Sequence, residues 1–237
     1  MAEPMLQVDG LKAGYGPAEV LFGVTLTLHR GEVAALMGRN GAGKSTTMKA
    51  VMGLLPARSG RVRFAGTDTT GMAPFRIARL GLGYVPEDRR IFTDLTVFEN
   101  LEVGRKPARQ GREAWTPERL FAVFPNLAEM RNRRASAMSG GEQQMLTIAR
   151  TLMGNPDAVL LDEPSEGLAP VIVEQMAEAV LRMKAEGIAV LLSEQNLDFA
   201  AAVADRAYVI ERGEIRYEGT MEALEADEAV REAHLTV

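Results

Sequence analysis

The sequence of 237 residues contains no cysteine and only two histidines, and aromatic residues make up 5% of it. The absence of cysteine excludes disulfide bonds and thiolate metal sites, and it fits a reducing compartment such as the cytosol. No apolar run approaches the ~18 residues that a membrane-spanning helix needs, and the first residues lack the pattern of a secretion signal. We therefore expect any association with a membrane to go through a partner protein.

Neither sign of charge is in large excess, because the formal net charge is only −5 although 25% of the residues are charged. Such a chain has no overall positive field, so nucleic acid is not supported as a partner. The hydrophobic content of 46% is ordinary for a globular protein and sufficient for one large domain or two small ones.

Short apolar runs alternate with helical patterns along the chain. The runs lack period-two alternation, which is typical of strands buried on both faces, and each helical pattern ends near a glycine. This alternation predicts an α/β fold with a parallel sheet whose ligands bind at the carboxyl ends of the strands. The predicted strands are Val33–Met37, Val159–Leu161 and Ala189–Leu192, and the predicted helices are Lys44–Met52, Gln143–Met153 and Val171–Ala185.

Other segments have sequence patterns that are typical of antiparallel strands. Antiparallel patterns at Leu26–Leu28, Arg61–Phe64 and the pair Tyr208–Ile210 with Ile215–Tyr217 predict a smaller antiparallel β layer. Residues 87–154 are expected to form a helical subdomain inserted into a core of about 1–86 and 155–237, so that the whole chain is one domain with a mixed sheet. The acidic tail from 222 to 232 is expected to form a solvated helix.

The strongest motif is a glycine-rich segment between a predicted strand and a predicted helix. Its spacing fits the P-loop, in which backbone amides and a helix amino end surround phosphate oxygens. In such a loop Lys44 would reach the terminal phosphates and Ser45 would offer an oxygen to magnesium. The alternative is an unoccupied glycine turn. The motif consists of Gly38, Arg39, Asn40, Gly41, Ala42, Gly43, Lys44 and Ser45.

A second motif places two carboxylates at the end of the strand Val159–Leu161. Beside a P-loop, Asp162 can hold magnesium through water, and Glu163 can polarise the water that attacks the γ-phosphate. Without the P-loop, the simpler interpretation would be an acidic turn after a buried strand.

The third motif, Ser139-Gly140-Gly141-Glu142-Gln143, opens the predicted helix Gln143–Met153. Ser139 could simply cap that helix. However, a helix amino end with bare amides is also an anion site, and one nucleotide cannot easily occupy two such sites in a small domain. We therefore expect this turn to grip ATP that is bound to another subunit.

With these three motifs in this order, the chain resembles the ATP-binding cassette (ABC) family over essentially its whole length. The resemblance implies a P-loop ABC ATPase fold and a head-to-tail dimer that closes over two ATP molecules, each with Mg²⁺, and drives attached membrane subunits. It places Tyr15 against adenine, Thr46 beside the nucleotide, and the signature motif at Ser139–Gln143. The helical subdomain would contact the membrane subunits.

Three positions depart from the family pattern. Glu87 stands where a glutamine usually touches magnesium, and a carboxylate can still ligate the metal. Gln195 replaces the usual switch histidine; it can donate a hydrogen bond to the γ-phosphate but cannot take up a proton, which leaves Glu163 as the best candidate base. Ala169 replaces a frequent aspartate in the dimer-contact loop. Glu87 and Gln195 could alternatively be ordinary loop residues.

These departures and the segments around them resemble one branch of the family, the ATPases of branched-chain amino acid importers. The segments are Val85–Phe92, Ser139–Leu146, Leu161–Pro170 and Glu194-Gln195-Asn196. That resemblance implies two transmembrane permeases, a second ATPase subunit that is identical or different, and, indirectly, a periplasmic substrate-binding protein. It also implies a peripheral location on the cytoplasmic side of the inner membrane. The alternatives are the same role for urea or short amides, an ABC ATPase that acts on nucleic acid or the ribosome, and a nucleotide-binding regulator without turnover.

Overall fold

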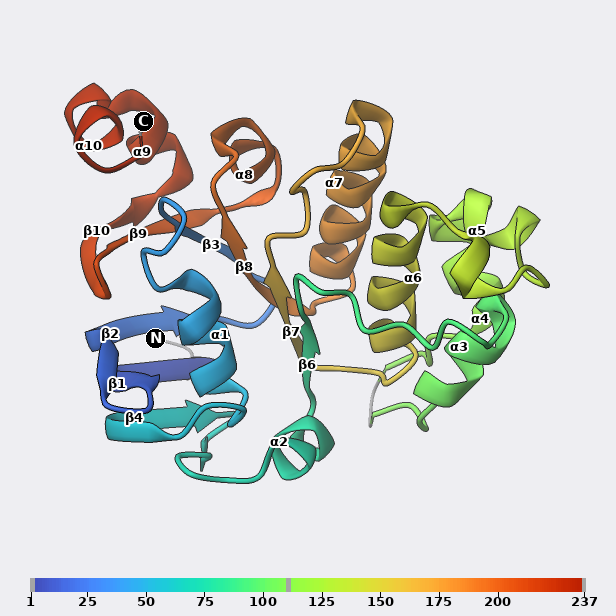
Figure 1. The fold of residues 1–237 in the computed structure, drawn as a ribbon, viewed down its shortest axis with the longest axis horizontal. Helices are drawn as coiled ribbons and strands as arrows, with labels where there is room; N and C mark the ends of the chain where they lie inside the picture. The colour runs from blue at the N-terminus through green and yellow to red at the C-terminus, as the bar shows by residue number, and fades with distance from the viewer. Residues whose placement is uncertain (1–2, 110–111, 236–237) are drawn as a thin grey trace.

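A six-stranded sheet forms the centre of the computed structural model, which describes residues 3–109 and 112–235 (Figure 1). Its five inner and edge strands from β9 to β6 run parallel, and β10 pairs with β9 in the antiparallel direction. In spatial order the strands are β10 (Glu214–Thr220), β9 (Arg206–Glu211), β3 (Val33–Met37), β8 (Ala189–Glu194), β7 (Ala158–Asp162) and β6 (Leu82–Val85).

A second, antiparallel sheet lies against one face of the first, with α1 (Lys44–Val51) nearby. Residues Ala34 and Leu36 of β3 share a core with this small sheet and with Met48 of α1. The strands, in spatial order, are β2 (Ala18–Leu28), β1 (Leu6–Tyr15), β4 (Ala57–Phe64) and β5 (Thr67–Asp68).

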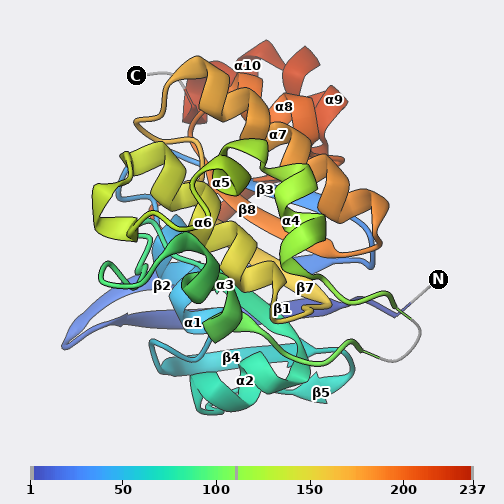
Figure 2. The same ribbon diagram turned by 90° about the vertical axis from the view of Figure 1, so that its right-hand side faces the viewer.

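Helices cover the opposite face of the large sheet (Figures 1 and 2). Val33, Ala35 and Met37 of β3 point into this second core, so every residue of the strand is buried. This burial on both faces is why the strand reads as an unbroken apolar run. The helices on this side are α3 (Val97–Gly104), α4 (Pro117–Val123), α5 (Pro125–Glu129), α6 (Gly140–Leu152), α7 (Pro170–Ala185) and α8 (Leu197–Val203), with a 3₁₀ turn at Ala135–Ala137.

The remaining helices are short. α2 (Pro74–Leu80) precedes β6, and the tail forms two helices, α9 (Met221–Ala226) and α10 (Glu228–His234). The prediction of one solvated tail helix was therefore wrong in part: Asp227 caps a second helix, and Met221 and Leu224 are buried. No helix in the described ranges is long and apolar enough to cross a membrane.

The predicted parallel strands and the three predicted helices are confirmed, with shifts of a few residues at their ends. One placement differs. Tyr208–Ile210 and Ile215–Tyr217 do pair in the antiparallel direction, but they belong to the large sheet and not to the smaller β layer. The reason is that the free side of β9 pairs with β3, from Ala34↔Arg206 to Met37↔Val209. Leu26–Leu28 and Arg61–Phe64 lie in the small sheet, as predicted.

Candidate nucleotide site

The P-loop segment joins the end of β3 to the start of α1. Glycine is required at its first position, because a Cβ on Gly38 would lie 2.4 Å from the carbonyl oxygen of Ile210. Gly43, the N-cap of α1, has φ +116° and provides no side-chain cap for the helix. The local fold thus presents the amino end of α1 in the open form that suits a phosphate group.

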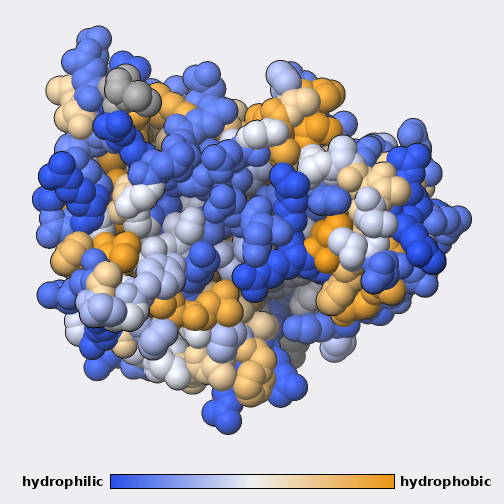
Figure 3. Space-filling model, in the orientation of Figure 1, coloured by the Kyte–Doolittle hydropathy of each residue, from blue (hydrophilic) through white to orange (hydrophobic). Residues whose placement is uncertain are grey.

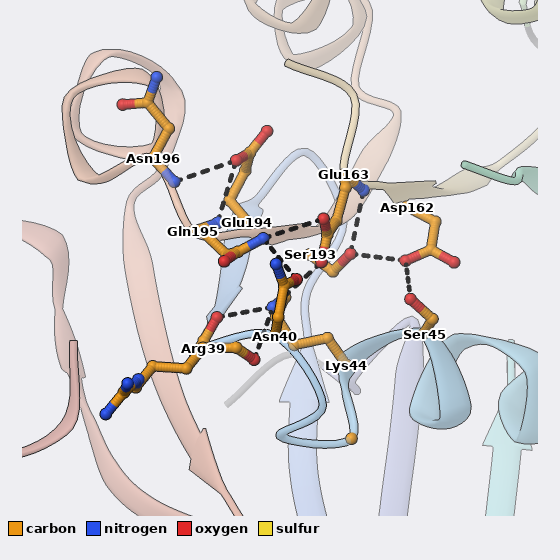
Figure 4. A network of polar contacts seen from close by, with 12 residues as sticks. Arg39, Asn40, Lys44, Ser45, Asp162, Glu163, Ser193, Glu194, Gln195 and Asn196 are labelled. Atoms are coloured by element: carbon orange, nitrogen blue, oxygen red, sulfur yellow. Dashed lines mark hydrogen bonds and ion pairs between the residues drawn. The ribbon is translucent and has the colours of Figure 1, made fainter. Parts of the chain in front are cut away.

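Lys44 lies at the base of this loop and is only 3% exposed. Its ammonium donates to the carbonyl oxygens of Gly38 (2.6 Å) and Arg39 (3.1 Å) and lies 3.0 Å from Oε1 of Glu163 (Figure 4). A buried charge needs such partners, and here they fix its position before any ligand is present. The side chain of Arg39 points away from this cluster, so Arg39 contributes its backbone.

Asp162 ends β7 and accepts hydrogen bonds from three side chains. The hydroxyls of Ser45 (2.9 Å) and Ser193 (2.7 Å) donate to Oδ1, and the hydroxyl of Tyr84 (3.1 Å) donates to Oδ2. Burial, followed by the charge of Asp162, raises the pKa of Tyr84 above its usual value, so the phenol stays protonated and remains a donor. The aspartate predicted to serve magnesium is thus held in place beside the predicted hydroxyl ligand.

Glu163 follows in a left-handed backbone conformation, with φ +48°. Its amide donates to the carbonyl oxygen and to the hydroxyl of Ser193, both at 3.1 Å. Burial opposes ionisation of its side chain, but hydrogen bonds from Glu166, Lys44 and Gln195 outweigh burial and lower the pKa. The unusual backbone therefore directs an ionised carboxylate into the site.

Gln195 follows β8 and reaches across to the P-loop. Its side-chain amide donates to Oδ1 of Asn40 (2.8 Å) and to Oε2 of Glu163 (3.1 Å). The glutamine thus contacts the loops that follow β3 and β7 at the same time (Figure 4).

A cavity of about 520 Å³ lies over these groups. Tyr15 lies at its wall with 48% of its surface exposed, so part of the residue is accessible to a ligand. The described residues that line the cavity are Tyr15, Val20, Asn40, Gly41, Gly43, Lys44, Ser45, Thr46, Glu87, Glu163 and Glu166. A neighbouring hollow of about 800 Å³ shares Asn40, Glu163 and Glu166 with it and also contains Gln195.

The oxygen groups at this cavity fit a magnesium ion. Ser45 and Asp162 lie in contact, and Glu87 lines the same cavity, so the predicted ligands are all hard oxygen donors. Among the described residues there is no cluster of three or more acidic, histidine or cysteine side chains that could hold a metal alone. A protein that presents few ligands suits Mg²⁺, which retains waters and binds phosphate oxygens.

The predicted signature residues lie elsewhere. Ser139–Glu142 open α6, which packs on the opposite face of the large sheet from α1, and none of them lines the cavity described above. The turn caps itself: Oε2 of Glu142 accepts from the amide of Ser139 (2.7 Å), and the amide of Glu142 donates to the Ser139 hydroxyl (3.4 Å). The single chain therefore does not bring the signature turn to its own P-loop.

Comparison with known proteins agrees with this geometry. A family model described as "ABC transporter" matches residues 21–166. The chain is 42% identical to the high-affinity branched-chain amino acid transport ATP-binding protein BraG of Pseudomonas aeruginosa, over 98% of this chain and 99% of that protein. The chain belongs to the ABC transporter family.

Further relatives of this cassette include a probable branched-chain amino acid transport ATP-binding protein LivF of Archaeoglobus fulgidus, 33% identical over 93% and 94% of the two chains. The lipopolysaccharide export ATP-binding protein LptB of Haemophilus influenzae is 34% identical over 98% and 97%. Among solved structures, the ADP conformation of MJ1267, an ATP-binding cassette of an ABC transporter, superposes with a TM-score of 0.82 at 29% identity, covering 98% of both chains. As a cassette of this family, the chain binds and hydrolyses ATP and serves membrane permease subunits.

Sequence reasoning missed three residues of this cassette's site. Tyr84 and Ser193 both hydrogen-bond to Asp162, and Glu194 lies buried behind Gln195. The available signal for Ser193 was the parallel register, since Asp162 of β7 pairs with Ser193 of β8. Tyr84 gave no signal, because it lies in the short strand β6 and its contact depends on the sheet order.

Proposed function

We propose that this cassette is the ATP-hydrolysing subunit of an importer for branched-chain or other hydrophobic amino acids. The observation that carries the proposal is the 42% identity to BraG over nearly the full length of both chains. The identity to LptB is lower over a similar span, so amino-acid import is favoured over lipopolysaccharide export.

In the proposed reaction ATP occupies the cavity over the P-loop. Tyr15 lies against adenine, the amides of residues 38–46 surround the phosphates, and Lys44 contacts the terminal ones. Ser45, Asp162 and Glu87 would hold Mg²⁺, which supplies charge neutralisation of the phosphates when bound. These assignments are supported by the lining of one cavity, which includes Tyr15, Lys44, Ser45 and Glu87, and by the hydrogen bond from Ser45 to Asp162.

Glu163 then orients and polarises the attacking water, since its carboxylate is kept ionised at the mouth of the same cavity. Gln195 donates a hydrogen bond to the γ-phosphate from the side of Asn40. Glutamine does not titrate, so the proton from water is assigned to Glu163.

The working unit is a head-to-tail pair of ATPase subunits. Ser139, Gly140, Gly141 and Glu142 contact ATP held by the other subunit, which accounts for their distance from their own P-loop. Following the importer branch, we assign a different ATPase as the partner, with two permeases and a periplasmic binding protein completing the system. The subunit would work at the cytoplasmic side of the inner membrane.

The permeases are proposed to dock where the helical subdomain, residues 87–154, meets the core of 1–86 and 155–237. A groove of about 470 Å³ lies there, and the exposed side chains of Leu54, Phe92 and Val103 line it. Elsewhere, Figure 3 shows a largely hydrophilic face with separate apolar patches, one of them over α7, where Val171 is 57% exposed. Apolar surface of this kind marks protein contacts.

Co-purification tests this function directly. A tagged Glu163→Gln chain is expressed in its host, trapped with ATP in gently solubilised membranes and analysed by mass spectrometry, with Lys44→Met as the untrapped control. Two permeases and a second ATPase are expected. Ribosomal or DNA-associated partners without permeases would overturn the proposal.

Uptake identifies the cargo. Cells that lack the chain should regain labelled leucine uptake with the wild type and not with Lys44→Met. Recovery of urea uptake alone, or of lipopolysaccharide export alone, would contradict amino-acid import.

A further inference from the structure

Glu194 is a buried carboxyl group that the mechanism above does not use. It is the last residue of β8 and only 2% exposed. Its Oε1 accepts a hydrogen bond from the amide of Ser165 (3.0 Å), and its Oε2 accepts from the amides of Gln195 (3.1 Å) and Asn196 (3.2 Å). Figure 4 shows the contacts of this carboxylate with the amides of Gln195 and Asn196.

These donors belong to two different loops. Ser165 lies in the loop 163–169 that follows β7 and includes Glu163, whereas Gln195 and Asn196 follow β8. In addition, the backbone carbonyl of Glu194 accepts from the amide of Gly38 at 3.3 Å, at the start of the P-loop. One residue thus contacts all three loops that surround the proposed γ-phosphate position.

We propose that Glu194 is a positioning residue that couples the loop 163–169 to Gln195, so that a displacement of that loop moves the glutamine toward or away from the γ-phosphate. The inference rests on the proposed function, because it gives the coupling a role in hydrolysis. Gln195 in turn contacts Asn40 and Glu163, so its backbone position decides where its amide points.

Hydrogen-bond chemistry explains why this position needs a carboxylate. The partners of the Glu194 carboxylate all donate to it: they are the amides of Ser165, Gln195 and Asn196 and the Ser165 hydroxyl. An ionised carboxylate suits them because it offers two acceptor oxygens and no donor. Glutamine has the same shape but only one acceptor, and its NH₂ group would face an N–H donor. Glu194→Gln can therefore hold one loop or the other, but not both.

The substitution is tolerable for folding. Burial raises the pKa of Glu194, although hydrogen bonds from the Ser165 hydroxyl and from the three amides oppose this effect. Glutamine has the same size as glutamate, so the substitution leaves no cavity at the buried position. A matched control is Glu32→Gln, at the far end of the sheet, where Glu32 pairs with Arg206 (2.9 Å) and accepts from the amide of His29 (2.6 Å). That variant also removes a half-buried carboxylate with N–H partners.

The test is a double-mutant cycle on the full chain. For Glu194→Gln, Gln195→Ala and the double variant, phosphate release gives kcat, a fluorescent ATP analogue gives the Kd, and thermal melting reports folding. We expect Glu194→Gln to lower kcat about tenfold and to change the Kd by less than about threefold. The double variant should be no slower than Gln195→Ala alone, because coupled residues are not additive. Glu32→Gln should keep the wild-type kcat.

Three results would overturn the inference: a wild-type kcat in Glu194→Gln, equal losses of kcat and ATP affinity, or multiplicative effects in the double variant. If Glu194→Gln does not fold, Glu194→Asp is measured in the same cycle, since it keeps both acceptors on a shorter stem. Failure of the proposed function looks different, because it would appear in the wild-type chain as missing permease partners or missing leucine uptake, and neither result depends on the Glu194 variants.

Discussion

Two glycine-rich turns of this cassette each open a helix, yet they differ in whether a side chain caps the free backbone amides at the start of that helix. At α1 the N-cap is Gly43, without a side-chain cap, and the buried Lys44 lies beneath the turn. At α6, Ser139 and Glu142 cap the helix reciprocally. The amides of the first turn are therefore free to bind the phosphates of a nucleotide held by the same chain. At the second turn, side chains of the turn itself accept hydrogen bonds from some of the amides until a ligand from another subunit binds.

The difference teaches that glycine content alone does not define a phosphate site. Whether a turn can bind the phosphates of a nucleotide held by the same chain depends on the absence of a side-chain cap at the helix start and on the strands that bring charged groups beside it. The carboxyl ends of β3, β7 and β8 bring Lys44, Asp162, Glu163 and Gln195 to the first turn, and no such strand ends at the second.

Removal of the Lys44 ammonium should abolish most of the ATP hydrolysis at the P-loop turn. Lys44→Met removes the ammonium that contacts the P-loop carbonyls and Glu163, and leaves the buried carboxylate of Glu163 without its cation. Phosphate release should fall about 10³-fold. Arg39→Met, with an exposed side chain directed away from the site, is the matched control. Equal losses in both variants would contradict the special role of Lys44.

The turn at Ser139 should be protected from alkylation only when a partner subunit brings bound ATP to it. Because the chain lacks cysteine, Ser139→Cys provides a single thiol for alkylation. In the assembled transporter with Glu163→Gln, ATP should slow labelling by about tenfold, since a bound ligand buries most of its contact surface. The exposed Ser136→Cys, in the preceding 3₁₀ turn, should label at an unchanged rate.

An ATP effect that is equal in the isolated, dilute chain would mean that the chain's own nucleotide protects this turn. That result would remove the distinction between the two turns.

Self-capping of α6 should be measurable as stability. Glu142→Ala removes the carboxylate that accepts from the Ser139 amide, which should lower stability by about 1 kcal/mol. The melting temperature should fall by about 2–4 °C for a chain of this size. Glu178→Ala, exposed on α7, should shift it less. Equal shifts would show that the capping box is not stabilising.

The smallest effect concerns pH at the open turn. The hydrogen bond to Glu163, burial and nearby negative charges raise the pKa of Glu166 to about 7. The folded chain therefore binds more protons than the unfolded chain as pH rises from the ordinary glutamate value to about 7, and stability falls across this window. Glu166→Gln should raise the melting temperature by about 1–2 °C at pH 8 and not at pH 5.

The exposed Glu129→Gln on α5 is the control for that comparison, and its melting temperature should follow the wild type at both pH values. An equal shift for Glu166→Gln at pH 5 and pH 8 would rule out the charge repulsion described.

Much of the fold could be predicted because the central strands are apolar on both faces. The strand Val33–Met37 was predicted with its observed bounds, and the motifs at the ends of β3 and β7 converge because the strands are parallel. β6 was missed, since Leu82–Val85 is only four residues long and includes Gly83 and Tyr84. The β9–β10 pair was assigned to the wrong sheet, because an antiparallel pattern does not indicate which strand pairs with the other edge of the hairpin.

Side-chain partners set the limit of sequence reasoning at the site. Lys44 and Ser45 were predictable from spacing, but the Lys44–Glu163 ion pair and the Gln195–Asn40 hydrogen bond join residues more than 100 positions apart. Glu194 directly precedes Gln195 in the sequence, but no role was predicted for it, because its partner Ser165 comes from another loop. Such contacts depend on the sheet order and on loop conformations that no local pattern encodes.

The central claim is that Glu163 activates water at a nucleotide site that the other residues build. The most direct test compares phosphate release and ATP affinity for the wild type and Glu163→Gln, an isosteric change at a carboxylate that pairs with Lys44 at 3.0 Å. If Glu163 activates the water, kcat should fall about 10²–10⁴-fold in Glu163→Gln, and the Kd for ATP should stay within about threefold of the wild type. Undiminished hydrolysis by Glu163→Gln would contradict the claim.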